Sequence, residues 1–227
     1  MKTSILQFSP SKLIAPLILA AGMVLACASN VQAVTFGYSS ADQAVIDFPG
    51  NHTFHFNSGV AGHDFMVTTG TAAGLFGNIT GTFTIGTITV NGTTESAPVT
   101  GSGTFVIHDG ANDLTATLQW VDITQMGTGG TLNIQGVVNL TNITYAGTNA
   151  DLVALRNAGN AANVLTFQFV PAVDLITLSN GGVDHSTSYS GTVGTLPDGG
   201  TTVALLGLAL TGLEGLRRRV KKGKARI

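Results

Sequence analysis

Apolar and polar residues alternate along much of this chain, and this period of two limits the folds it can adopt. The alternation is clearest in three stretches, Leu114 to Trp120, Leu132 to Leu140 and Leu165 to Phe169. Successive side chains of a strand point to opposite faces, so each stretch buries one face and exposes the other. Half-buried strands of this kind are typical of antiparallel sheets. We therefore predict an antiparallel β fold with Trp120 in its core.

The parity of the apolar residues changes twice, and each change indicates an irregular strand. Ile85 is odd-numbered but Ile88 and Val90 are even-numbered, and Leu140 is even-numbered but Ile143 is odd-numbered. One inserted residue, as in a β-bulge or bend, moves the side chains that follow to the other face. We expect such a feature at each of these two places.

Turn-forming residues separate the predicted strands, and only residues 151–161 have helical spacing. The turn clusters are Asn57-Ser58-Gly59, Asn91-Gly92, Asp109-Gly110, Gly127 to Gly130 and Asn180-Gly181-Gly182. The best fit is an all-β domain, a single antiparallel β-sandwich of jelly-roll-like form with roughly nine to twelve strands. A barrel or a short solenoid is the alternative, although no repeat of fixed period is present.

The N-terminal segment has the layout of a secretory signal peptide. Lys2 and Lys12 supply positive charge, and an apolar run follows from Leu13 to Ala26. The run is shorter than the roughly 20 apolar residues that a membrane-spanning helix needs. Small residues follow it, as they do before a signal-peptidase site. We predict cleavage after Ala33, with Ala28 as the second choice.

Cys27 is the only cysteine, and it lies within this segment. Its setting after Val24-Leu25-Ala26 loosely resembles the lipid-attachment box of bacterial lipoproteins. Leu25 is unusual in that box, and the chain has a second candidate anchor, so we favour an unmodified small residue. Cleavage after Ala33 then leaves no cysteine, and the mature domain must be stable without disulfides.

The C-terminal segment has three parts. Leu196-Pro197-Asp198-Gly199-Gly200 precedes an almost wholly apolar run from Thr201 to Leu216, and a basic cluster begins with Arg217-Arg218-Arg219. As a helix the run would be about 24 Å long at 1.5 Å per residue, which makes it a marginal anchor for a ~30 Å hydrocarbon core. The basic cluster should stop transfer and stay cytoplasmic.

This arrangement resembles the PEP-CTERM class of bacterial sorting signals, and within it the VPDSG-CTERM variant. Leu196 stands where the variant usually has Val, and Gly199 where it often has Ser. The resemblance implies recognition by an exosortase, a membrane-embedded peptidase that cuts near the Pro motif. It also implies a bacterium that makes exopolysaccharide, a transient inner-membrane anchor, and a final place on the cell surface or in the extracellular matrix.

The charges of the chain are strongly partitioned. Residues 34–196 contain Arg156 as their one basic residue against ten acidic residues, a net charge of −9 with the histidines neutral. Such a field repels nucleic acid and anionic lipid, and it favours divalent cations or cationic partners. We therefore expect no nucleic-acid function.

The chemistry-bearing residues of this middle region do not form a recognisable catalytic set. It has one Glu and scattered Asp residues, mostly in turns, and no nucleophile elbow, zinc-protease motif or phosphate-binding loop. The histidines are expected at the surface or in turns, with His52 and His55 on opposite faces of a strand. They are His52, His55, His63, His108 and His185. We predict that the protein is not an enzyme.

One loop has oxygen ligands of the kind that calcium binds. Asp109, Asn112 and Asp113 surround Gly110, whose turn would let them converge. The spacing is not that of an EF-hand, and three side chains are too few ligands alone. We favour a simple Asp-Gly turn and keep calcium as the one candidate cofactor.

The chain thus divides into a signal peptide (1–33), a β-domain (34–195) and a sorting segment (196–227). The leading expectation is an exported, non-enzymatic structural protein of the cell surface or matrix, in contact with exopolysaccharide or with itself. A carbohydrate- or calcium-binding adhesion module is the alternative, and an extracellular hydrolase ranks third. Its expected partners are an exosortase and, transiently, the membrane.

Overall fold

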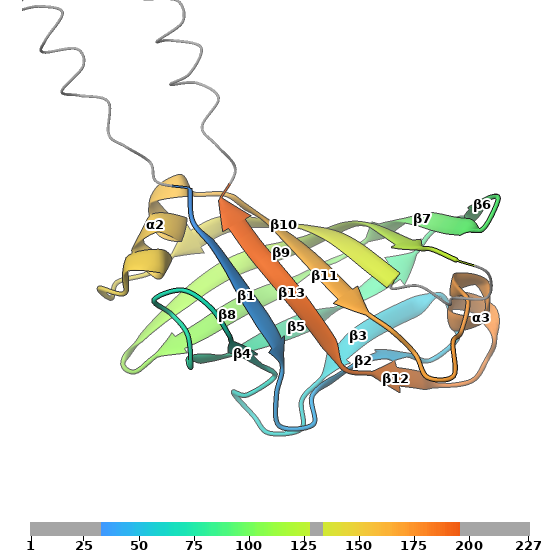
Figure 1. Ribbon diagram of the computed structural model, residues 1–227, viewed down its shortest axis with the longest axis horizontal. Coiled ribbons are helices and arrows are strands. Elements are labelled where there is room, and N and C mark those ends of the chain that lie inside the picture. Colours follow the sequence, from blue (N-terminus) through green and yellow to red (C-terminus); the bar gives the residue numbers. More distant parts are fainter. Residues whose placement is uncertain (1–32, 128–133, 196–227) are drawn as a thin grey trace, which may run out of the picture. The chain divides into compact units, whose positions relative to one another are not determined.

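The computed structural model describes residues 33–127 and 134–195, which form thirteen β-strands and two helices (Figure 1). The strands pair throughout in antiparallel fashion, so the predicted all-β antiparallel fold is confirmed. No helix within these two ranges is long and apolar enough to span a membrane. Most of the predicted signal peptide and all of the predicted sorting segment lie outside the described residues.

The strands are β1 (Thr35–Ser40), β2 (Val45–Phe48), β3 (Thr53–Asn57), β4 (Phe65–Val67), β5 (Phe76–Ile85), β6 (Thr89–Asn91), β7 (Thr94–Thr100), β8 (Ser102–Asp109), β9 (Asn112–Gln125), β10 (Ile134–Thr144), β11 (Ala161–Phe167), β12 (His185–Thr187) and β13 (Tyr189–Thr195). The helices are α2 (Ala150–Ala158), as the helical spacing of residues 151–161 predicts, and α3 (Leu175–Asn180), which we did not predict. Each begins at a side-chain cap, Asn149 for α2 and Asp174 for α3.

Eight of the strands pair around a partial ring. The order is β5, β4, β1, β13, β11, β10, β9 and β8, and β8 returns to β5. The ring is weakest at β4, which meets β5 only through Phe65 opposite Gly77 and Met66 opposite Phe76. The other five strands extend from this ring. β3 pairs with β5, β2 with β3, and β12 with β2. β7 pairs with both β5 and β9, and β6 pairs with β7.

The strands are therefore joined in one sheet, whereas the predicted sandwich has two separate sheets. The reason lies in β5, which pairs with β8 and then β7 along one edge and changes its partner along the other edge, from β4 at Phe76 and Gly77 to β3 at Thr82–Thr84. Gly81 stands at the change with a φ of 130°, which glycine adopts without penalty. A Cβ on neighbouring Gly103 would lie 1.8 Å from the carbonyl oxygen of Thr80, so only glycine allows this approach.

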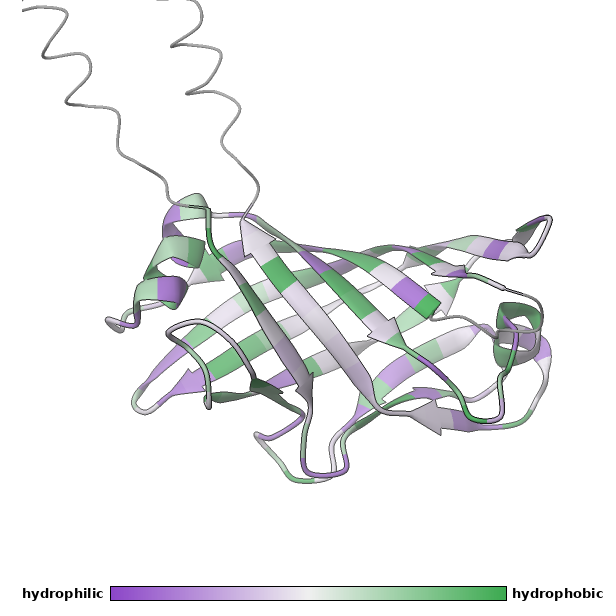
Figure 2. Ribbon diagram, viewed as in Figure 1, coloured by the Kyte–Doolittle hydropathy of each residue, from purple (hydrophilic) through white to green (hydrophobic). Residues whose placement is uncertain are grey.

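The core is rich in aromatic rings, and the alternation predicted along the strands is visible in the hydropathy colouring of Figure 2. Trp120 is 3% exposed and packs edge-on against Phe54 at 4.7 Å, which confirms its predicted place in the core. Gly136 on the neighbouring strand leaves room for the indole, because a Cβ there would lie 2.0 Å from Trp120 Cζ2. The indole N–H donates to the carbonyl oxygen of Asp122.

The two places where the apolar residues change parity, after Ile85 and after Leu140, have different structures. The β9–β10 register shifts between Thr141 and Thr144, where Asn142 has a φ of 52°, and this confirms the predicted irregularity after Leu140. At the other place β5 simply ends at Ile85, and Val90 is 56% exposed on the short strand β6. Its apolar character there reflects strand propensity rather than burial.

Candidate functional site

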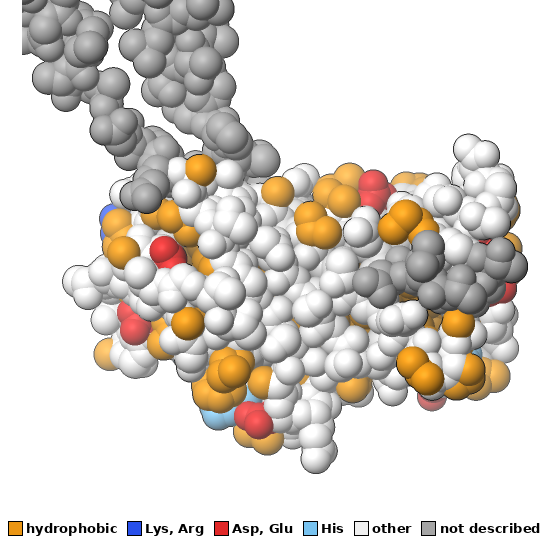
Figure 3. Space-filling view, in the orientation of Figure 1, with side chains coloured by type: hydrophobic (Ala, Val, Ile, Leu, Met, Phe, Trp, Pro, Cys, Tyr) orange, Lys and Arg blue, Asp and Glu red, His pale blue; other side chains and the backbone are white. Residues whose placement is uncertain are grey.

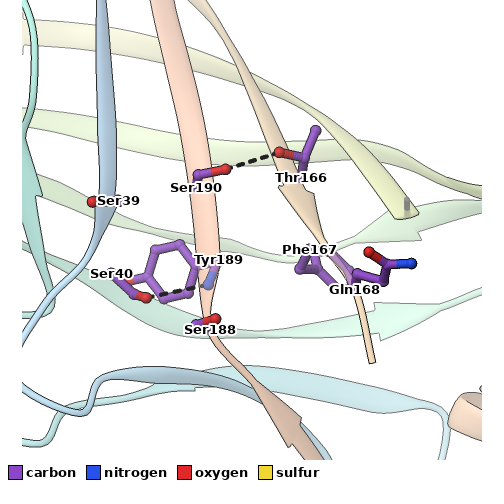
Figure 4. Close-up of a pocket in the computed structure, with 8 residues that line it drawn as sticks. All are labelled: Ser39, Ser40, Thr166, Phe167, Gln168, Ser188, Tyr189 and Ser190. Carbon is purple, nitrogen blue, oxygen red and sulfur yellow. Dashed lines mark hydrogen bonds between the residues drawn. The ribbon is translucent and has the colours of Figure 1, made fainter. Parts of the chain in front are cut away.

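A shallow groove of about 470 Å³ lies on the outer face of β1, β13 and β11 (Figure 4). Its lining is dominated by small hydroxyl side chains that project from the three strands. The lining residues are Ser39, Ser40, Thr166, Phe167, Gln168, Ser188, Tyr189 and Ser190. Because strand residues alternate, outward Ser190 stands between buried Tyr189 and buried Gly191, and the same pattern places Thr166 outside.

Local hydrogen bonds hold the hydroxyls of the groove in place. Thr166 Oγ1 and Ser190 Oγ are 3.0 Å apart across β11 and β13, as Figure 4 shows. The Ser40 hydroxyl accepts from the backbone N–H of Tyr189 at 3.3 Å. These hydroxyls line the groove, and a hydroxyl can both donate a hydrogen bond to a ligand and accept one from it.

The groove carries no ionised group. The phenol of Tyr189 is turned inward and donates to the backbone oxygen of Asp64 at 3.0 Å. Burial raises the pKa of Tyr189 far above its ordinary value of 10, with smaller contributions from Tyr38 and Asp64. A ligand would therefore meet neutral hydrogen-bonding groups only.

The groove is one part of a longer row of polar side chains, which we call the polar row. Its members lie directly opposite one another on six neighbouring strands, β1, β13, β11, β10, β9 and β7, and all are exposed or half-buried. They are Ser39, Ser190, Thr166, Gln135, Thr124 and Ser96. Strands lie 4.7–4.9 Å apart, so the row is about 24 Å long.

An apolar pair borders the polar row. Val137 and Val164 lie opposite each other on β10 and β11, two residues along from Gln135 and Thr166, and each is 38% exposed. The face that Figure 3 shows is mostly neutral, with scattered apolar side chains and few charges. A row of hydroxyl and amide groups beside exposed methyl groups suits a ligand with both hydroxyls and C–H faces.

The predicted calcium loop is the hairpin between β8 and β9. Asp109 pairs with Asn112, and Gly110 has a φ of 60°, as an Asp-Gly turn requires. Asp109 accepts a hydrogen bond from the Tyr145 hydroxyl, while Asp113 bonds His108 Nδ1 at 3.0 Å. The two carboxylates thus bind different protein groups, and no three His, Cys, Asp or Glu side chains of the described ranges converge on a metal position. The hairpin is thus the simple Asp-Gly turn that we favoured, and calcium binding stays the alternative that a titration must test.

Two histidines that are 45 positions apart in the sequence lie at the same hollow in the structure. His63 and His108 line one hollow of about 400 Å³, together with Phe76, Leu75 and a short Ala-Gly segment. His63 lines this hollow, whereas the next residue, Asp64, is buried. Sequence spacing could not show the pairing, because it depends on the register of β5 with β8.

The predicted export residues lie mostly beyond the described ranges. Leu196 to Gly200 and Arg217 to Arg219 are outside them, and Ala33 lies just before β1. What identifies the C-terminal segment is a family model described as the VPDSG-CTERM motif, which matches residues 197–220. No curated protein and no solved structure matches the chain.

The predicted sorting signal is thereby confirmed. The VPDSG-CTERM motif is an exosortase-dependent sorting signal, which implies a protein that is exported to the cell surface and processed by an exosortase.

Proposed function

We propose that this exosortase-sorted protein is a non-enzymatic structural component of a bacterial cell surface or extracellular matrix. The observation that carries the proposal is the motif at residues 197–220, which begins two positions after the last strand ends at Thr195. The folded domain is thus the part that the sorting machinery delivers. Its one basic residue, Arg156, and its net charge of −9 suit a protein that must not adhere to nucleic acid or anionic lipid.

The proposed route has three steps. A signal peptide leaves after Ala33, the apolar run from Thr201 to Leu216 holds the chain in the inner membrane, and Arg217-Arg218-Arg219 keeps the tail cytoplasmic. The exosortase then cuts near Pro197 and releases the domain to its final position.

The polar row gives the proposal a specific contact surface. Its hydroxyl and amide groups and the adjacent Val137–Val164 pair suit a neutral polysaccharide, which offers both hydroxyls and C–H faces. Multiple weak contacts along about 24 Å would favour an extended chain over a single sugar. The second candidate function, a carbohydrate-binding adhesion module, rests on the same surface and differs in being selective for one glycan.

Sorting is tested by mass spectrometry of the protein from host cells with and without the exosortase. We expect the protein from wild-type cells to lack everything beyond the Pro197 region, and the protein from the deletion strain to retain the tail. A protein that ends at Ile227 in both strains contradicts sorting.

Glycan contact is tested by comparing two double variants, each of which removes one pair of hydroxyl groups that bond across neighbouring strands. Thr166→Val with Ser190→Ala removes the hydroxyls from the groove, and we expect polysaccharide binding to fall at least fivefold. Thr80→Val with Thr104→Ala is the control, since these two hydroxyls also bond across strands, at 2.5 Å, but lie on β5 and β8 away from the polar row. Equal binding by both double variants contradicts a role for the polar row. Binding to one glycan rather than to many distinguishes the adhesion module from the structural protein.

A further inference from the structure

The chain has two Asn-Gly pairs, and both lie within the described residues. Asn91 ends β6 and Gly92 begins the turn to β7, whereas Asn180 ends α3 and Gly181 follows it. An asparagine that precedes glycine can react with its own main chain, because the glycine nitrogen can attack the side-chain Cγ and no Cβ on the glycine hinders the approach. The product is a five-membered ring, so rotation about the bonds of one residue is enough to bring the two atoms together.

Accessibility does not distinguish the two pairs, but the hydrogen bond of the glycine nitrogen does. Asn91 and Asn180 are both exposed, and so are Gly92 and Gly181. The Gly181 N–H donates to the Thr177 oxygen at 2.8 Å and so continues the helical bonding of α3. The rotation that would bring this nitrogen to Asn180 Cγ breaks that bond. Folding therefore protects Asn180.

Gly92 lacks this restraint. Its N–H donates no hydrogen bond to any group of the described residues, and a Cβ built on Gly92 would find no atom within 4 Å. Strand β6 is three residues long, is exposed throughout, and pairs with β7 alone among the described strands. A short exposed strand at the edge of a sheet opens at low free-energy cost, and this opening supplies the rotation that the attack needs.

We propose that Asn91 is a site of spontaneous deamidation. A base, water or hydroxide, removes the proton of the Gly92 nitrogen, which then forms a bond to Asn91 Cγ. The Cγ–Nδ2 bond breaks, and Nδ2 takes up a proton and leaves as ammonia. Water then opens the resulting succinimide at one of its two carbonyl carbons, which leaves aspartate or isoaspartate at position 91. The sum is one water consumed and one ammonia released, and no enzyme, metal or oxidant takes part.

Both products alter the β6–β7 hairpin. Each adds one negative charge, which takes residues 34–196 from −9 to −10. Isoaspartate also adds one atom to the main chain at a two-residue turn, and the length of the turn fixes the register of a hairpin. The pairs Thr89–Ser96 and Val90–Glu95 would then be lost, and β7 would become the edge of the sheet. The site would record the age of the folded protein, and it does not depend on the proposed function.

The test is incubation of the folded protein recovered from host cells, at pH 6 and at pH 8, followed by peptide mapping with mass spectrometry. We expect Asn91 to convert at least tenfold faster than Asn180, because only Asn180 requires the opening of a hydrogen-bonded helix end. Conversion should be faster at pH 8, since hydroxide removes the proton of the Gly92 nitrogen. Asn91→Gln is the matched variant: it keeps a side-chain amide but would have to form a six-membered ring, so position 91 should not convert.

Guanidinium chloride separates the effect of the fold from that of the sequence. In the unfolded chain the bond from Gly181 to Thr177 is absent, so Asn91 and Asn180 should convert at similar rates. In the folded isoaspartate form, hydrogen exchange should be faster in β6 and unchanged in β9, and unchanged exchange in β6 would contradict the loss of register. The proposal is overturned if Asn91 converts no faster than Asn180 in the folded protein, or if the tenfold difference persists in guanidinium chloride.

Discussion

Val34 and Thr195 are joined by two hydrogen bonds at the edge where the described domain begins and ends. The Val34 N–H donates to Thr195 Oγ1 at 3.0 Å, and the Thr195 N–H donates to the Val34 oxygen at 2.9 Å. They extend the β1–β13 ladder by one step beyond Thr35 and Gly194. The first and last strands are therefore neighbours, and the two ends of the described domain lie side by side.

The first prediction is that the exported protein begins at Val34. Cleavage after Ala33 leaves β1 complete, and it turns the Val34 nitrogen into an α-amino group that still has the Thr195 hydroxyl as its acceptor. N-terminal sequencing of the protein recovered from the cell surface measures this. A first residue within or beyond β1 would contradict the predicted site, because the pairing with β13 would be lost. A start at Ser29 would favour cleavage after Ala28.

The second prediction is that Thr195→Val destabilises the domain by about 1 kcal/mol, the net value of one hydrogen bond. Valine keeps the shape of the side chain but removes the Oγ1 that Val34 uses. Thr192→Val is the control, since Thr192 is exposed on the same strand, and it should stay within about 0.5 kcal/mol of the wild type. Urea unfolding followed by tryptophan fluorescence measures both. Equal free energies of unfolding for the two variants would show that the hydrogen bond from the Val34 N–H to Thr195 Oγ1 does not stabilise the domain.

The third prediction concerns the glycine beneath the single tryptophan. Gly136→Ala should cost about 1–3 kcal/mol or more, the usual range for overpacking a core, because its Cβ would lie 2.0 Å from Trp120 Cζ2. Gly194→Ala is a matched strand glycine whose Cβ would come no closer than 3.3 Å, to the Thr35 hydroxyl. We expect a lower unfolding midpoint and a shifted Trp120 emission only for Gly136→Ala. Identical midpoints would mean that the sheet yields without cost.

How far the sequence predicted this structure depends on the range of the interaction. Alternation is a local property, and it correctly placed Trp120 and Leu165 inside and Thr166 outside. The spacing of residues 151–161 is local as well, and it correctly predicted α2. By contrast α3 was missed because it spans only Leu175–Asn180 and has too few residues to show a helical period.

The candidate sites depend on register, which the sequence does not reveal. Ser39, Thr124 and Ser96 become members of one row only when six strands pair in the order that the structure shows. His63 and His108 line one hollow only because β5 pairs with both β4 and β8. Each of these residues looks ordinary in its own segment. Only the tripartite C-terminal segment was specific in sequence, since its parts are contiguous.

The fourth prediction is that calcium leaves the melting temperature unchanged. The carboxylates of Asp109 and Asp113 bond Tyr145 and His108, so an ion would have to replace both contacts. A scan with added calcium, and a second with chelator, measures this on the processed protein. A rise that Asp109→Asn abolishes would restore the calcium site and contradict the simple turn.

The last prediction uses the unusual lack of lysine and cysteine in residues 34–196. In the processed protein only the tyrosines titrate near pH 10 and above, because Arg156 stays charged beyond pH 12. Burial raises the pKa of Tyr38, against a smaller opposing effect of its hydrogen bond to Asn163 Oδ1, and burial also raises that of Tyr189. Burial and the neighbouring Asp109 raise the pKa of Tyr145.

A phenol whose pKa is raised on folding holds its proton in the folded state after the unfolded chain has lost it. Its contribution to stability is therefore fully present below pH 10 and is lost as the pH rises towards the folded pKa. We expect the free energy of unfolding to fall above pH 10 by up to about 1.4 kcal/mol per pH unit for each of the buried phenols of Tyr38 and Tyr189. Tyr38→Phe should reduce this slope, and it should cost about 1–3 kcal/mol at neutral pH because buried Asn163 loses its partner. Urea titrations from pH 7 to 11.5 measure both effects, and an unfolding free energy that stays constant above pH 10 would show that the phenols titrate normally in the folded domain.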